Sequence, residues 1–163
     1  MNNKTIATAD LCDDYAEQLQ ISAPIWRSFG QHAAFHGEVV TVKCFEDNSK
    51  VKEQLATAGN GRVLVVDAGN SQRRAHLGDL LAQQAIDNGW VGVVVYGLIR
   101  DSAVIANLPI GVKAVGTHPL KTEKNGEGQV GITLQFANMT IDSGDYLYAD
   151  EDGIIVAKQP VHF

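Results

Sequence analysis

The sequence predicts a single α/β domain that has a central βαβ unit and a carboxyl-terminal half rich in β-hairpins. Two valine-rich runs, 62–67 and 91–96, flank an amphipathic stretch, which is the order of a strand, a helix and a second strand. From Ile132 onward apolar and polar residues alternate between glycine-containing turns, as they do in hairpins. The 163 residues, of which 45% are hydrophobic, suit one domain over residues 1–163.

The helix of the βαβ unit is expected to begin at about Gly78. Its apolar positions recur every four residues, with Leu80 beside the stripe: Leu77, Leu81 and Ala85. Asn88-Gly89 then supplies residues that tolerate the left-handed conformation at the end of a helix. The run 91–96 is apolar without alternation, so we expect a strand that is covered on both faces.

Three further elements are expected in the amino-terminal half. They are a short helix capped by Thr8 or Asp10, a strand over 38–45 and a helix over about 50–58. Val40, Val42 and Cys44 share one face of that strand. Cys44 is therefore expected to be a small core residue and not a nucleophile.

Two other patterns have competing interpretations. His32 and His36 are four residues apart, which suits two metal ligands on a helix, but Gly30 and Gly37 argue against a stable helix there. The segment 121–131 contains three glycines among charged residues, so we expect a mobile segment or an interface loop.

A candidate site is expected where the central helix begins and the following strand ends. Twenty residues separate Asp79 from Arg100, about the length of one helix, a turn and one strand, so both can lie at the same edge of a sheet. The free backbone amides at the helix start can hold a carboxylate, and they belong to Gly78, Asp79, Leu80 and Leu81. Arg100 can then bind two oxygens of the same ligand. Asp101 is a hard carboxylate of the kind that holds a largely hydrated Mg²⁺ or Mn²⁺.

The same residues also have a plain structural interpretation. Asp79 can be a first-turn charge that favours the helix dipole, and Arg100-Asp101 can be a solvated loop pair. Glu46 and Asp47 follow the earlier strand, where most acids cap the next helix, yet they can also approach the waters of a metal.

The overall charge restricts the partners. A net charge of −6 repels phosphate backbones, so no direct binding of nucleic acid is expected.

Cys12 and Cys44 are too few and too far apart for a metal cluster, and residues 1–5 are not followed by the apolar run of a signal peptide. Since no apolar stretch approaches a membrane span, the expectation is a cytoplasmic protein without a membrane partner.

Three longer sequence segments extend the pattern beyond the spacing of Asp79 and Arg100-Asp101. They are 37–48 (GEVVTVKCFEDN), 61–67 (GRVLVVD) and 144–150 (GDYLYAD), and together they resemble the RraA-like family from about Asp10 to Val156. The resemblance implies a layered β/β/α swivelling-type domain that assembles as a ring-shaped homotrimer.

The resemblance also implies a choice between two functions. The family comprises regulators of ribonuclease activity and metal-dependent 4-hydroxy-4-methyl-2-oxoglutarate aldolases. Its aldolase branch carries an Asp, twenty residues and then Arg-Asp, which this chain matches at Asp79, Arg100 and Asp101, whereas the regulator branch typically lacks the second Asp. A demethylmenaquinone methyltransferase label is also applied to such proteins, but no glycine-rich loop suited to a nucleoside cofactor is present.

The expected function is therefore a divalent-metal-dependent lyase that acts on small 2-oxo acids. It would cleave 4-hydroxy-4-methyl-2-oxoglutarate to pyruvate and would decarboxylate oxaloacetate through the same pyruvate enolate. Arg100 and a metal on Asp101 would stabilise the enolate, and Asp79 would move a proton through a bound water. The alternative is a non-catalytic regulator that binds and inhibits a ribonuclease, since an acidic oligomer suits an arginine-rich partner.

Overall fold

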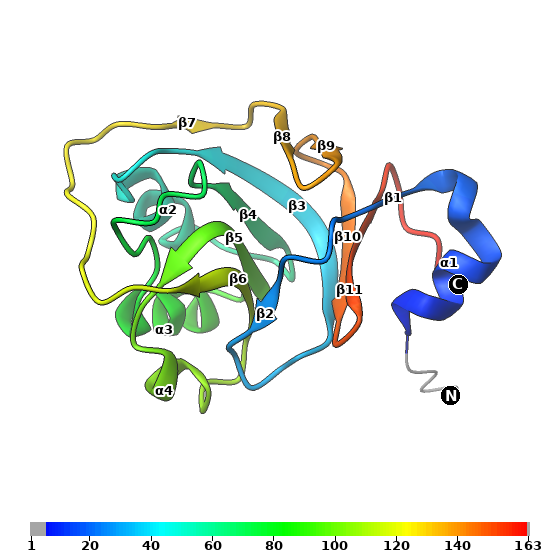
Figure 1. Cartoon of the computed structure of the whole chain (residues 1–163), viewed down its shortest axis with the longest axis horizontal. Coiled ribbons are helices and arrows are strands. Elements are labelled where there is room, and N and C mark those ends of the chain that lie inside the picture. The colour runs from blue at the N-terminus through cyan, green and yellow to red at the C-terminus, as the bar shows by residue number, and fades with distance from the viewer. Residues whose placement is uncertain (1–5, 163) are drawn as a thin grey trace.

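A curved mixed sheet organises the fold, and α2, α3 and α4 lie together on one side of it (Figure 1). The computed structural model describes residues 6–162, so the expectation drawn from residues 1–5 lies outside the described residues. The helices are α1 (Thr8–Tyr15), α2 (Ser49–Leu55), α3 (Asp79–Asp87) and α4 (Ser102–Ile105), with a 3₁₀ turn at Ala16–Gln18. The strands are β1 (Leu19–Ile21), β2 (Arg27–Ser28), β3 (Phe35–Lys43), β4 (Val63–Asp67), β5 (Gly92–Ile99), β6 (Gly111–Thr117), β7 (Gln129–Val130), β8 (Leu134–Phe136), β9 (Met139–Ile141), β10 (Tyr146–Asp150) and β11 (Gly153–Ala157).

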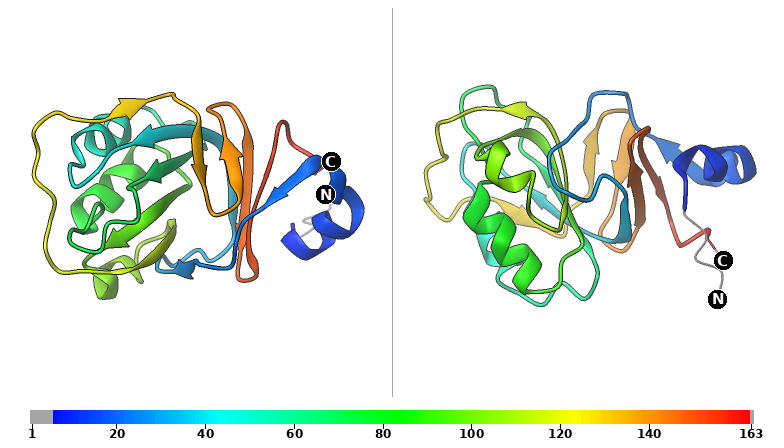
Figure 2. Two further views of the ribbon diagram at one scale, coloured as in Figure 1. Left: turned by 45° about the horizontal axis from the view of Figure 1, so that its top comes forward. Right: turned by 90° about the horizontal axis from the view of Figure 1, so that it is seen from below.

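The strand pairing joins a parallel half to an antiparallel half. The order is β1-β11-β10-β3-β4-β5-β6-β2, in which β3, β4, β5 and β6 are parallel and the outer pairs are antiparallel. β8 and β9 form a separate hairpin. The two views of Figure 2 place α1 at the opposite end of the molecule from α2 and α3. The predicted layered α/β class with hairpins in the carboxyl-terminal half is confirmed.

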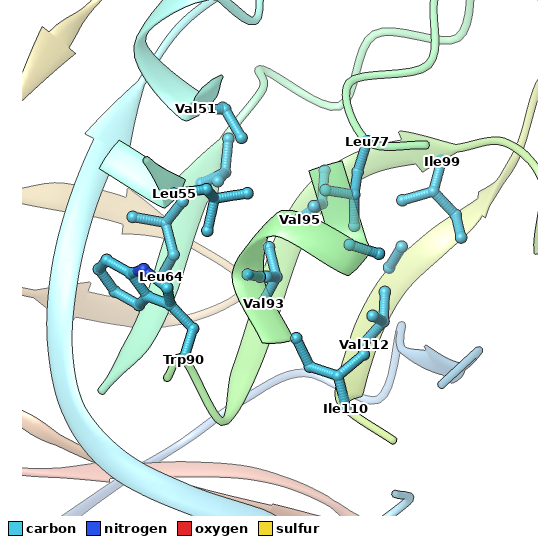
Figure 3. Close-up of a cluster of buried hydrophobic side chains, with 14 of the residues drawn as sticks. Val51, Leu55, Leu64, Leu77, Trp90, Val93, Val95, Ile99, Ile110 and Val112 are labelled. Atoms are coloured by element: carbon cyan, nitrogen blue, oxygen red, sulfur yellow. The ribbon is translucent and has the colours of Figure 1, made fainter. Parts of the chain in front are cut away.

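Alternating residues of the central strands fill two separate cores. Leu64, Val93 and Val95 face the helices, where they pack with residues such as Leu55 of α2 and Leu77, which lies just before α3 (Figure 3). The side chains between them face the hairpins instead, in a core that includes Val63, Val65, Val94, Leu134, Phe136, Met139 and Ile141. The central strands are therefore apolar at consecutive positions because both faces are buried, as predicted.

The predicted βαβ unit is present as β4, α3 and β5, with two differences. β5 runs to Ile99, beyond the expected end at 96, because Gly97 takes a φ of 159° and a bulge between Val95 and Leu98 lets the pairing with β6 resume. Leu80 is 81% exposed, and Ala82 takes the buried place on α3. The predicted flanking role of Leu80 is therefore wrong.

The predicted side-chain cap of the first helix is also wrong. Ala7 is the N-cap of α1, and neither Thr8 nor Asp10 makes a capping bond within the helix. The Asp150 carboxylate of β10 instead accepts hydrogen bonds from the Thr8 amide at 2.8 Å and the Thr8 hydroxyl at 2.7 Å. A carboxylate distant in sequence thus satisfies the helix start and fixes α1 to the sheet.

The strand expected over 38–45 begins earlier, at Phe35, and ends at Lys43. Val42 and Cys44 lie in the core that faces the helices, as predicted. Burial, with smaller contributions from Asp47 and Asp67, raises the pKa of the Cys44 thiol to about 12, which is consistent with a core residue and not a nucleophile. His36 lies in β3, so the helical metal pair with His32 does not form.

Asp47 connects α2 to segment 121–131, which was expected to be a mobile segment or an interface loop. Its carboxylate accepts bonds from the Ser49 amide at 2.9 Å and the Ser49 hydroxyl at 2.6 Å. The same carboxylate accepts the amides of Asn125 at 2.8 Å and Glu127 at 3.2 Å, and β7 then pairs with β3. Segment 121–131 is thus hydrogen-bonded to the body of the domain. Among residues 6–162, no helix has the length and apolar character needed to cross a membrane.

We predict that Asp47→Asn destabilises the fold by about 2 to 3 kcal/mol at neutral pH, because an amide cannot accept all four bonds. Burial opposes ionisation of Asp47, but the bonds from Ser49, Asn125 and Glu127 outweigh it and lower the pKa to about 2. Since the folded-state pKa is depressed, the stabilisation is present above the unfolded pKa and is lost as the pH falls toward 2. Urea unfolding at several pH values should show the wild-type advantage shrinking in that window. The control is Asp14→Asn, at an exposed position of α1. An equal gap at every pH would contradict the prediction.

Candidate active site

A cavity of about 590 Å³ lies where α3 begins and the parallel strands end. All six residues predicted for the site line it: Gly78, Asp79, Leu80, Leu81, Arg100 and Asp101. The remaining lining residues come from α2 and its N-cap, from the segment before α3, from the rest of α3 and its end, and from the segment after β6: Asn48, Lys52, Ala75, Leu77, Gln83, Gln84, Asp87, Asn88, Lys121 and Lys124. The structure therefore brings the predicted residues together, next to a group of lysines that the sequence did not indicate.

Backbone pairing at residues 75–77 positions the two elements that form the site, the start of α3 and the end of β5. Ala75 forms parallel bridges with Leu98 on one side and Lys121 on the other. The His76 amide donates to the Leu98 carbonyl at 2.9 Å, and the Arg100 amide donates to the Leu77 carbonyl at 2.9 Å. This short extended piece leads directly into Gly78, so the start of α3 is held against the end of β5.

The Asp101 side chain links the end of β5 to the start of α3. Its backbone is left-handed, with a φ of 57° and a ψ of 35°, which Asp and Asn tolerate better than most residues. Its Oδ2 accepts the Asp79 amide at 3.0 Å and lies 3.9 Å from the Arg100 Nε. The bond from the Asp79 amide is the main cause that lowers the pKa of Asp101, and Arg100 adds to it. Asp101 is consequently an anion at neutral pH.

Gly78 is required by close approach and not by its backbone angles. Its φ of −130° and ψ of −172° are open to any residue. A Cβ at this position would lie 2.8 Å from the Asp101 Oδ2 and 3.4 Å from the Arg100 Nε. Only glycine leaves room for both functional groups to lie against the helix start.

Two of the four backbone amides that were predicted to bind a ligand carboxylate at the helix start already donate to acceptors within the protein. The Asp79 amide donates to Asp101, and the Leu80 amide donates to the Asp79 Oδ1 at 2.9 Å. The amides of Gly78 and Leu81 make no hydrogen bond within the described residues. These two amides are the donors that remain for a ligand.

Glu46 and Asp47, the two acids that follow β3, make their side-chain contacts away from the cavity. The Glu46 carboxylate accepts hydrogen bonds from Nε and Nη2 of Arg73, each at 2.8 Å, and from the Ser71 hydroxyl at 2.7 Å. Asp47 is occupied by α2 and the 121–131 segment, and neither acid lines the cavity. The structure gives both acids contacts outside the cavity, and an approach to the waters of a metal stays a prediction.

Two buried polar residues behind the site were not predicted. His76, which had no assigned role, is fully buried, and its Nε2 accepts the Glu46 amide at 2.9 Å. Asn48 lines the cavity and donates from its Nδ2 to the His76 carbonyl at 3.1 Å. Burial lowers the pKa of His76, so its ring is neutral and can accept that bond. No sequence pattern pairs these positions, because they are 28 residues apart and meet only in the fold.

The donor set suits a hydrated hard cation and not a closed metal cage. Within residues 6–162, no group of three or more His, Cys, Asp or Glu side chains converges on one point. Asp101 is ionised and its side chain is 35% exposed, and Asp79 lies next to it. A single accessible carboxylate of this kind can hold Mg²⁺ or Mn²⁺ that keeps most of its waters.

Comparison with known proteins assigns the chain to a family. A family model described as RraA-like, Aldolase/RraA, matches residues 8–156. The chain belongs to the RraA-like family. This RraA-like chain is 57% identical over 152 residues to a protein of Marinomonas sp. (strain MWYL1) named "Putative 4-hydroxy-4-methyl-2-oxoglutarate aldolase", a match that covers 93% of this chain and 94% of the relative.

Two solved structures share the RraA-like fold closely. One, from Geobacillus kaustophilus and named as an S-adenosylmethionine: 2-dimethylmenaquinone methyltransferase, has a TM-score of 0.94 and 46% identity, covering 96% of this chain and 97% of that one. The other, the RNA-processing inhibitor RraA from Thermus thermophilis, has a TM-score of 0.94 and 40% identity, covering 98% and 96%. Because one fold carries three different names, function has to be argued from the site.

We predict that Gly78→Ala keeps the fold but displaces the Asp101 carboxylate. The added Cβ cannot coexist with the present Oδ2 position, and the backbone angles cost alanine nothing, so unfolding free energy should change by only about 1 kcal/mol. Losing the Asp79 amide should raise the pKa of Asp101 toward its ordinary range. Carboxyl-carbon NMR titration measures that pKa, and thermal unfolding controls for fold. An unchanged Asp101 titration would show that the close approach is not needed.

Proposed function

We propose that this RraA-like protein is a divalent-metal-dependent lyase that cleaves 4-hydroxy-4-methyl-2-oxoglutarate to pyruvate and, as a secondary activity, decarboxylates oxaloacetate. The observation that carries the proposal is the convergence of Asp79, Arg100 and Asp101 at one helix start inside one cavity. The aldolase name of a relative at 57% identity supports the substrate. Each residue type corresponds to one requirement for breaking the bond between the α and β carbons of a 2-oxo acid.

Binding and orientation of the substrate fall to the helix start and to Arg100. The free amides of Gly78 and Leu81 are suited to the carboxylate next to the 2-oxo group, because the positive end of the helix favours an anion. The Arg100 guanidinium, with its side chain 38% exposed, can reach the 2-oxo oxygen and hold the negative charge that develops there. Asp101 would hold the divalent cation, which would supply Lewis acidity to the reaction.

The bond changes balance without a further reactant. In retro-aldol cleavage the C4 hydroxyl loses its proton to Asp79, directly or through one water, and the C3–C4 bond breaks. The bonding electrons form the enolate of pyruvate, C4 becomes the carbonyl of a second pyruvate, and the enolate takes up a proton at C3. With oxaloacetate the C3–C4 bond also breaks, carbon dioxide leaves, and the same enolate results.

We predict that Asp101→Asn lowers Mg²⁺ affinity and pyruvate release together, each by about a hundredfold or more. Asparagine tolerates the left-handed backbone and keeps an oxygen for the Asp79 amide, so stability should change by less than about 1 kcal/mol. A pyruvate-coupled assay, a Mg²⁺ titration and a melting curve on one preparation measure all three quantities. Full metal-stimulated activity in this variant would defeat the lyase proposal.

The same variant separates the second candidate function, a protein-binding inhibitor of a ribonuclease. That candidate is favoured by the 40% identity and matching fold of the RNA-processing inhibitor from Thermus thermophilis. Ribonuclease binding that persists in Asp101→Asn, together with a wild-type protein that releases no pyruvate, would support the regulator. Metal-dependent pyruvate release by the wild type would support the lyase.

We predict that Arg100→Lys lowers kcat/KM by roughly tenfold to a thousandfold, or about 1.4 to 4 kcal/mol of transition-state stabilisation. An ammonium provides one point charge where the guanidinium fork provides two parallel donors. Arg27→Lys is the matched control, because Arg27 packs over the Phe29 ring and does not line the cavity. Equal rates for the two variants would remove Arg100 from the reaction.

A further inference from the structure

His76 is a fully buried histidine that lies just before the start of α3 and does not line the cavity. Its main chain belongs to the frame of the site, because its amide donates to the Leu98 carbonyl at 2.9 Å. Its ring makes a further bond, in which Nε2 accepts the Glu46 amide at 2.9 Å. The proposed reaction gives this ring no role.

The direction of that bond fixes the state of the ring. A backbone amide can only donate, so Nε2 carries no proton and the imidazole of His76 is neutral. Burial favours the same state, because it lowers the pKa of His76. The ring is thus a fixed acceptor inside the protein. Lysine or arginine could not replace it, since neither side chain has an acceptor atom.

The bond is made to a residue whose backbone is strained. Glu46 has a φ of 57°, in the left-handed region that glycine, asparagine and aspartate adopt more readily than glutamate. Such a conformation persists only where neighbouring groups hold it. The Glu46 side chain binds Ser71 and Arg73, but the Arg73 side chain is 72% exposed, and exposed ion pairs contribute little. His76 Nε2 is therefore the buried acceptor for the main chain of this turn.

The same histidine also contacts the residue that connects this turn to the cavity. The Asn48 Nδ2 donates to the His76 carbonyl at 3.1 Å, and Asn48 lines the cavity as the N-cap of α2. His76 thus contacts the loop between β3 and α2 at two points, with its ring at Glu46 and with its main chain at Asn48. Because Gly78 follows only two residues later, these contacts relate the start of α2 to the start of α3.

We propose that His76 is a positioning residue of the candidate active site, whose neutral ring holds the turn at Glu46 so that Asn48 and the start of α2 form their part of the cavity wall. The inference rests on the proposed function for its kinetic consequence and on the contacts alone for its structural one. Without the ring bond, Glu46 would relax toward an ordinary backbone conformation and the wall would shift. Small displacements within a site are costly in rate.

Three substitutions separate the hydrogen bond from the filling of space. His76→Gln keeps an acceptor that lies as many bonds from the backbone as Nε2 does. His76→Asn places its polar atoms one bond closer to the backbone, and His76→Leu fills space without an acceptor. Exchange of the Glu46 amide with solvent, measured by NMR, should accelerate by at least about tenfold in the Leu and Asn variants. In the Gln variant it should stay within about threefold of the wild type.

Kinetics with 4-hydroxy-4-methyl-2-oxoglutarate and Mg²⁺ should follow the same order. We expect kcat/KM to fall by about tenfold to a hundredfold in His76→Leu and His76→Asn, and to return to within about threefold of the wild type in His76→Gln. Affinity for Mg²⁺ alone should stay within about threefold in all three variants, because the Asp79 amide, and not the loop, holds the Asp101 carboxylate.

Arg73→Met is the matched control, because it removes the exposed contact of the same glutamate and leaves the ring bond in place. Both amide exchange at Glu46 and kcat/KM should stay within about threefold of the wild type. A loss in this variant equal to that in His76→Leu would assign the turn to the ion pair and overturn the inference.

The exchange data decide the inference separately from the proposed function. Equal exchange of the Glu46 amide in the wild type and in His76→Leu would overturn it, as would equal losses in His76→Gln and His76→Leu. Melting curves establish folding, and if His76→Leu does not fold, the contrast between His76→Asn and His76→Gln decides the same question. If the wild type releases no pyruvate, the lyase proposal fails, while fast exchange in His76→Asn with rescue in His76→Gln still supports the positioning role.

Discussion

The hydrogen bond from the Asp79 amide to the Asp101 carboxylate connects everything else in the site. It closes the gap between the start of α3 and the residue after β5, over a distance of 3.0 Å. It needs a glycine at position 78, where a side chain would occupy the place of Oδ2. It also keeps Asp101 ionised, because an amide at a helix start stabilises the charged form. One contact thus supplies position and charge together.

The rest of the fold can be understood as support for that contact. α3 is held on the sheet by Ala82 and Ala85, small residues that let the helix approach the valines of β4 and β5 closely. The pairing of residues 75–77 with the end of β5 fixes where the helix begins. His76 is buried beneath this point and binds the Glu46 amide, so the loop after β3 is tied to the same place. The candidate site therefore lies on elements that are hydrogen-bonded to one another, which favours pre-organisation.

Sequence periodicity was enough for the parts of the structure that depend on local pattern. The central helix, its end at Asn88-Gly89 and the doubly buried strands follow from spacing and from residues that tolerate special backbone angles. It failed where a distant group replaces a local one, as when Asp150 satisfies the start of α1. It also failed for Leu80, because a helix stripe does not reveal which edge residue faces a cavity.

The residues of the candidate site also fall into two sets, those that local sequence spacing predicted and those that only long-range contacts bring to the cavity. Asp79, Arg100 and Asp101 were recognisable because helix and strand lengths bring sequence spacing of about twenty residues to one edge. Lys52, Lys121 and Lys124 were not, since they reach the cavity through the pairing of Ala75 with Lys121 and of Asn48 with Thr122. Long-range contacts of this kind depend on the whole sheet being assembled. The candidate site therefore takes Asp79, Arg100 and Asp101 from one continuous stretch that contains α3 and β5, and takes its lysines from segments that only the finished fold brings near.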